Sequence, residues 1–177
     1  KGLFTQGMVC HKTFKDSKGD WVFPEDVIEK NGEFFEKNTK EKILVGPSES
    51  MSKSKKNVVD PETVIHLYGA DAVRWFVLSD SPPERDIQWS DEGISGSYKF
   101  IQKVWTISEM IKNIGDQHTI NEDEKIKYQR AINKLIKETT YNIKHFHFNV
   151  AVAKCYEFIN KKKKMLHENK AEKSAFL

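Results

Sequence analysis

The sequence has few cysteines, and their placement excludes two classes of site. Cys10 and Cys155 lie far apart, and no Cys or His residues have the close spacing of a zinc site. Two isolated thiols are typical of a protein kept in a reducing compartment. We therefore expect a cytoplasmic protein with no protein-bound metal.

Long apolar segments are also missing. No apolar run approaches the roughly 18 residues that a membrane span needs, and no segment has the pattern of a signal peptide. The formal net charge is only +3, which permits a nucleic-acid partner without requiring one. Eleven Phe and four Trp residues are enough to build a core, so the composition is not that of a disordered chain.

The first part of the chain has the pattern of a mixed α/β structure. Apolar runs predict strands over residues 3–10, 21–23, 43–45 and 87–89, and residues 24–30 could form one or two helical turns before Asn31-Gly32. Helices are predicted over residues 61–68 and 70–78. Asp60 and Pro61 fit the N-cap and first position of the earlier helix, and Gly69 fits its end. The run at residues 3–10 reads like a strand met partway through a domain, so we expect a piece of a longer protein.

Three long helical patterns follow. The first runs from Ser90 to about residue 114, the second begins with a capping box of Asn121 and Glu124, and the third is capped by Asn149. Amphipathic helices in series predict a bundle. The fold class expected is α+β passing to mostly α, with a boundary near Ser90.

The segment Ser50-Met51-Ser52-Lys53-Ser54-Lys55-Lys56-Asn57 concentrates hydroxyl and ammonium groups just before a helix start. Such donors in a loop suit the binding of nucleotide phosphates. Lys-Ser runs are also common in exposed basic turns, and that alternative stays open on the loop alone. Met51 is expected to be a packing anchor.

These residues resemble the KMSKS signature loop of class I aminoacyl-tRNA synthetases, with Ser50 in place of the first lysine. The resemblance extends over nearly the whole chain and is strongest with leucyl-tRNA synthetases of the bacterial type. It is carried by residues 46–57, Asp60-Pro61, residues 68–74, Ser81-Pro82-Pro83-Glu84, Trp89-Ser90-Asp91, residues 103–105 and residues 148–153. Valyl, isoleucyl and methionyl enzymes share the signature loop and remain alternatives.

The resemblance implies an arrangement of three parts. Residues 1–59 would be the end of a Rossmann-type catalytic domain with the signature loop, residues 60–90 a stem-contact fold, and residues 91–177 a truncated anticodon-binding helical bundle. The full enzyme would join leucine to ATP and transfer it to tRNA. No HIGH-type motif and no editing domain are found, and only residues 12–44 are free for a leucine-specific insertion. The fragment alone is therefore expected to be inactive.

The resemblance also implies roles for individual residues. Lys53 would be the catalytic residue that binds ATP phosphates, helped by Ser52, Ser54 and Lys55. The expected substrates are ATP with Mg²⁺, leucine and a leucine-accepting tRNA, and the expected state is a monomer. Possible tRNA contacts are Lys56, Arg74, Lys103, Trp105, Lys161, Lys162, Lys163 and Lys164.

Purely structural interpretations remain as alternatives to these roles. Core packing is the more ordinary role for Trp105, and the four lysines from Lys161 could be a soluble helix face. Two other functions also remain open for the chain: a stand-alone RNA-binding helical module without catalysis, and a helical protein–protein adaptor.

Overall fold

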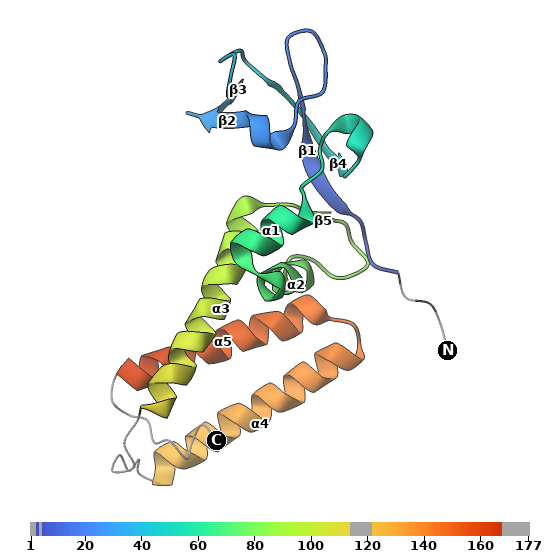
Figure 1. Cartoon of the computed structure of the whole chain (residues 1–177). Helices are drawn as coiled ribbons and strands as arrows, with labels where there is room; N and C mark the ends of the chain where they lie inside the picture. Colours follow the sequence, from blue (N-terminus) through green and yellow to red (C-terminus); the bar gives the residue numbers. More distant parts are fainter. Residues whose placement is uncertain (1–2, 4, 114–121, 168–177) are drawn as a thin grey trace.

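The computed structural model describes residue 3, residues 5–113 and residues 122–167. Strands gather at one end of the molecule and the long helices at the other, as Figure 1 shows. The fold class is mixed α+β, as the sequence predicts. Among the described residues, no helix combines the length and the apolar character needed to cross a bilayer.

A three-stranded sheet carries the signature loop. Its central strand β1 (Val9–Lys15) pairs antiparallel with β4 (Leu44–Ser50) and parallel with β5 (Ile87–Gln88). The register between β1 and β4 shifts at Lys12/Thr13, and Pro47 is the extra residue on β4. Proline fits there because a bulge residue donates no ladder hydrogen bond. The Pro47 carbonyl instead accepts a bond from Thr13 Oγ1 at 3.0 Å.

This pairing corrects two of the predicted strands. The first strand is residues 9–15 rather than 3–10, and Leu3 and Met8 from the predicted run are exposed. The predicted strand at 43–45 does not end at Gly46-Pro47, because the bulge lets β4 continue to Ser50. Pairing with a neighbouring strand sets both boundaries, and the local hydrophobicity of a segment does not reveal such a partner.

Residues 24–36 hold a second correction. The predicted helical turns are a 3₁₀ turn η1 (Pro24–Asp26) followed by strand β2 (Val27–Lys30), which pairs with the unpredicted β3 (Glu33–Glu36). Asn31 and Gly32 join the strands with φ of 52° and 81°. An Asn-Gly pair is therefore a hairpin turn here and not a helix stop. The predicted strand at 21–23 is only an isolated bridge between Trp21 and Lys15.

The helix that follows the loop begins and ends where its caps predict. Helix α1 (Pro61–Tyr68) follows Asp60, whose carboxylate accepts from the Glu62 and Thr63 N–H groups, and α2 (Ala70–Ser79) follows directly. Helix α3 (Asp91–Lys112) starts after Ser90, whose hydroxyl accepts from the Gly93 N–H at 3.1 Å. The core between these helices and the sheet consists of Val64, Ala72, Phe76, Ile87 and Ile94.

Helices α4 (Glu122–Lys144) and α5 (Phe148–His167) form the far end of the molecule (Figure 1). Trp75 of α2 stacks on Phe100 of α3 and meets the ring of Tyr156 of α5 edge-on, with centroids 4.9 and 6.0 Å away. Asn149 is not the cap of α5, because the helix has already begun at Phe148. The His147 carbonyl accepts the first helical bond, from the Ala151 N–H. The predicted cap Asn121 lies outside the described residues.

Candidate functional site

The signature loop (residues 50–57) leaves the end of β4 and makes one tight 3₁₀ turn, η2 (Lys53–Lys55). Ser52 before the turn is extended, and Lys56 after it is left-handed, with φ 51° and ψ 21°. A left-handed residue other than glycine costs about 1–2 kcal/mol, so the surrounding contacts must hold the reversal at Lys56 in place.

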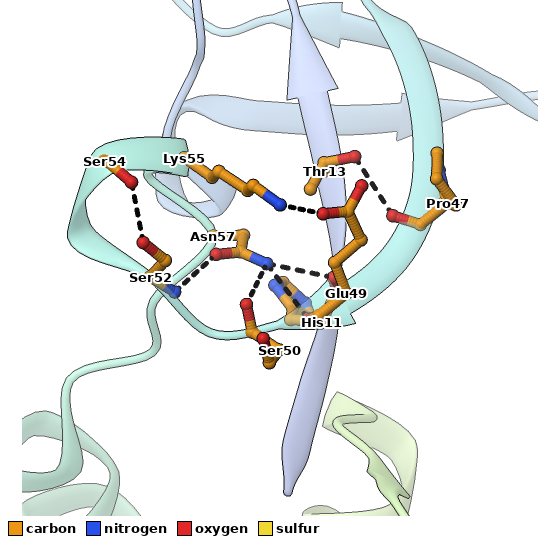
Figure 2. Close-up of polar contacts among 9 residues, drawn as sticks. All are labelled: His11, Thr13, Pro47, Glu49, Ser50, Ser52, Ser54, Lys55 and Asn57. Atoms are coloured by element: carbon orange, nitrogen blue, oxygen red, sulfur yellow. Dashed lines mark hydrogen bonds and ion pairs between the residues drawn. The ribbon is translucent and has the colours of Figure 1, made fainter.

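Asn57 is the contact that fixes the loop (Figure 2). Its side chain is only 1% exposed. Its Oδ1 accepts from the Ser52 N–H at 2.8 Å, and its Nδ2 lies 3.1 to 3.4 Å from the carbonyls of His11, Glu49 and Ser50. One amide therefore joins both ends of the loop to β1 and β4. Its donors and its acceptor are all used, so burial carries no desolvation penalty for an unmade bond.

Lys55 is already occupied by a neighbouring carboxylate. Its ammonium forms an ion pair with Glu49 on β4, and the two side chains are 39% and 34% exposed. Figure 2 shows the Lys55 side chain reaching back over the loop towards the strand. Lys55, one of the predicted phosphate ligands, is thus held against the sheet by Glu49.

Lys53 and the two serines are free to meet a ligand. Lys53 and Ser54 are exposed, and Ser52 is half-buried. The hydroxyls of Ser52 and Ser54 are 2.7 Å apart and bond to each other. The turn thereby carries one exposed ammonium and two neighbouring hydroxyl groups, which suit the oxygens of a polyphosphate.

A cleft of about 580 Å³ lies near the loop but has a different character. Its lining includes basic Lys12 and Lys37 together with acidic Glu29, Asp60 and Asp91. His11 also lines it, and burial lowers the pKa of this imidazole, with the charge of Lys12 adding to the effect and Asp91 opposing it. Carboxylates outnumber lysines in the whole lining and disfavour phosphate there, so the exposed lysine and the serines of the loop are the better anion site.

The predicted nucleic-acid contacts are scattered: Lys56 lies in the signature loop, and the others lie on α2, α3 and α5. Arg74 is exposed and pairs with Asp71 at 3.4 Å, and the Lys103 ammonium bonds to Asn160 Oδ1. The ordinary interpretation of Trp105 as a core residue is wrong, because its side chain is 69% exposed. The Lys112 ammonium lies 5.8 Å from its ring.

The lysine run on α5 is split between surface and interior. Lys161 is exposed, whereas Lys162 is 4% exposed and lies against the rings of Tyr128 and Phe158. Burial lowers the pKa of Lys162 to about 7. Neither a phosphate contact nor a solvated face fits this residue. The side chains of Lys163 and Lys164 lie outside the described part.

Two residues that organise the loop are not predicted from the sequence. Asn57 stands there only as part of the motif, and Glu49 has no predicted role. A single polar residue before the apolar Val58-Val59 is a weak signal, and nothing in the sequence indicates that Glu49 reaches Lys55.

Across residues 5–113 and 122–167, no cluster of three His, Cys, Asp or Glu side chains is placed to hold a metal ion.

Comparison with known proteins gives three results. Residues 42–90 match the family model of tRNA synthetases class I (I, L, M and V). The leucine–tRNA ligase of Rickettsia bellii (strain RML369-C) is 49% identical over 160 residues, and that of Rickettsia rickettsii (strain Sheila Smith) is 46% identical over 160 residues. Each alignment covers 90% of this chain and 19% of the relative, so the chain spans about a fifth of these ligases.

A solved structure is similar to the fold as well. The agnB2 LeuRS of Agrobacterium radiobacter K84, in a ternary complex with tRNA and LeuAMS, matches with a TM-score of 0.60 and 26% identity. The match covers 71% of this chain and 17% of that one. Sequence and structure therefore point to the same group of proteins.

Proposed function

The chain is homologous to a segment of leucine–tRNA ligases, and from this premise we propose that it supplies the ATP-phosphate loop and part of the tRNA-binding surface of such a ligase. The observation that carries the proposal is the signature loop itself. Its turn is fixed by Asn57 and carries exposed Lys53 between the bonded hydroxyls of Ser52 and Ser54. The 177 residues alone would not catalyse leucine-dependent exchange of pyrophosphate into ATP, because they contain no HIGH-type motif.

The proposed role of Lys53 follows from the charge changes in the reaction. A leucine carboxylate oxygen attacks the α-phosphorus of ATP, and the bond from that phosphorus to the leaving pyrophosphate breaks. Negative charge grows on the pyrophosphate, where an ammonium stabilises it most. Lys53 is the exposed cation of the turn, and Ser52 and Ser54 would donate hydrogen bonds beside it. Mg²⁺ would arrive with ATP as part of the substrate.

The arrangement of parts belongs to the same proposal. Residues 1–59 would close the catalytic domain, residues 60–90 would form the stem-contact fold, and residues 91–177 would begin the anticodon-binding bundle. The tRNA in the complex of the Agrobacterium LeuRS supports a tRNA partner for this chain. Exposed Arg74, Trp105 and Lys161 are the contacts we retain, with Lys56 and Lys103 as weaker ones. Lys162 is withdrawn because its ammonium is buried. We propose a monomer acting in the cytoplasm.

The decisive experiment is Lys53→Ala in a full-length ligase that carries this segment. Loss of a charge aimed at a developing anion costs about 10²–10³ in rate, and we expect that fall in adenylate formation with little change in leucine binding. Pyrophosphate exchange and a leucine titration measure the two effects.

Lys18→Ala is the matched control, because Lys18 is an exposed lysine in the turn before Gly19, away from the loop. It should leave exchange unchanged. A loss of less than about threefold for Lys53→Ala would return Lys53 to the status of a solvated loop residue.

A further inference from the structure

Glu49 is tied to the signature loop twice. Its carbonyl accepts from Asn57 Nδ2 at 3.1 Å, and its carboxylate forms the ion pair with Lys55. The residue lies on β4 opposite His11 of β1, so the sheet holds its backbone in place. The side chain therefore acts on the loop from a rigid support.

The carboxylate of Glu49 has the chemistry of the expected ligand. A carboxylate and a phosphate oxygen are both anionic acceptors for an ammonium, and each favours a short charge-assisted bond. The Lys55–Glu49 pair is still 39% and 34% exposed, so a second anion can approach it from solvent. Lys53, two residues earlier, has no carboxylate partner among the described residues and is open to the same anion.

We propose that Glu49 is an internal substitute for phosphate: it holds Lys55 against β4 until a bound polyphosphate replaces the carboxylate. This rests on the proposed function of the loop as a phosphate site. Lys53 makes the first contact, and Lys55 joins it once the ion pair exchanges. The exchange forms one ammonium–phosphate contact and breaks one ammonium–carboxylate contact, and it involves no covalent change. Glu49 thereby weakens nucleotide binding and keeps the empty loop in one conformation.

The first test is the reactivity of the lysine amines in the 177-residue chain without nucleotide. An acetylating reagent, read by fragment-ion mass spectrometry, should label Lys55 about two- to fivefold more slowly than Lys53, the range expected for a partly exposed ion pair. Glu49→Gln should remove most of this difference, because glutamine keeps the size and the backbone carbonyl but not the charge.

Glu33→Gln is the matched control. It breaks the exposed ion pair of Glu33 with Lys42 on the β2–β3 hairpin and makes the same change in net charge. It should raise the labelling of Lys42 and leave Lys55 unchanged. Equal labelling of Lys53 and Lys55 in the unsubstituted chain would overturn the proposal.

The second test is binding of inorganic triphosphate. Glu49→Gln should bind it about two- to fivefold more tightly than the unsubstituted chain, and the gain should shrink in a Lys55→Met background. Unchanged triphosphate affinity in Glu49→Gln, or no triphosphate binding by either chain, would overturn the proposal that Glu49 competes with phosphate for Lys55. These results are independent of the Lys53→Ala test in the ligase. A loop that exchanges Glu49 for phosphate while Lys53→Ala leaves catalysis intact would refute the proposed function alone.

Discussion

The signature loop buries Asn57 and the helix pair α4–α5 buries Lys162, with opposite electrostatic results. Asn57 is 1% exposed and every polar atom of its amide is bonded to the loop or the sheet. Lys162 is 4% exposed and lies against aromatic rings, where burial lowers its pKa to about 7. A neutral amide with satisfied bonds fixes a backbone, whereas a buried ammonium makes stability depend on pH.

The difference suits the two regions. The proposed function requires the loop to keep Ser52, Lys53 and Ser54 in one arrangement, and hydrogen bonds are directional enough to specify it. The helix pair needs only to fill space between α4 and α5, and the long methylene chain of a lysine can do this. Substitutions at Asn57 and Lys162 therefore test whether burial of a polar group has a structural purpose.

The largest effect is expected for Asn57→Ala. Removing the amide takes the acceptor from the Ser52 N–H and one donor from each of three carbonyls, and we expect a loss of about 3 kcal/mol in the free energy of unfolding. Denaturant unfolding measures it. Asn38→Ala, at an exposed turn, should stay within about 0.5 kcal/mol.

Asn57→Asp refines the same test. The carboxylate can still accept from Ser52 but cannot donate to the three carbonyls, so it should fail to restore stability at neutral pH. Full stability in either variant would mean that the loop does not depend on this side chain.

A smaller effect is expected from the titration of Lys162. Its folded pKa is about 7, below the unfolded value of 10.5, so the unfolded chain binds more protons between these limits. This contribution to stability is fully present above pH 10.5, decreases as pH falls and levels off below pH 7. Compared with Lys162→Met, the unsubstituted chain should gain about 2 kcal/mol between pH 7 and 9.

Unfolding free energies across that pH range provide the measurement. Lys161→Met is the control, because Lys161 is the exposed neighbour of Lys162 and its charge is not buried. The stability of this variant should change with pH as that of the unsubstituted chain does. A Lys162→Met variant whose stability runs parallel to the unsubstituted chain at every pH would contradict a buried, titrating ammonium.

The smallest effect separates the same two lysines on RNA. If Lys161 contacts a phosphate, Lys161→Met should reduce the log–log salt slope of tRNA binding by about 0.7–0.9, while Lys162→Met should leave the slope unchanged. Binding of a leucine-accepting tRNA across a salt series measures both. A reduced slope for Lys162→Met would contradict the burial of Lys162. Equal slopes for all three chains would mean that Lys161 is a solvated residue that does not contact RNA.

Much of the fold could be predicted where the signal is local. Helices α1 and α3 begin after Asp60 and Ser90, because a capping side chain and the N–H groups it bonds lie within three residues. Strand β5 was also predicted from its short apolar run. The β2–β3 hairpin was not, since Asn31-Gly32 fits both a helix stop and a hairpin turn, and only the pairing of the flanking residues separates them.

The candidate site was predicted only in part for a similar reason. The hydroxyls and ammoniums of the loop are visible in the sequence, and so is their resemblance to a known signature. The exposure of Trp105 and the burial of Lys162 are not, because each depends on where a neighbouring helix passes.

By itself the sequence determined the chemistry of the loop, the caps of its helices and the family to which it is similar, since residue types and short spacings carry these directly. The tertiary structure alone decided which donors are available. Glu49 precedes the loop and Asn57 is its last residue, but their effect on it depends on the sheet, which sets the distance and direction of each contact. Lys55 is therefore held and Lys53 is presented, although the two lysines are chemically identical.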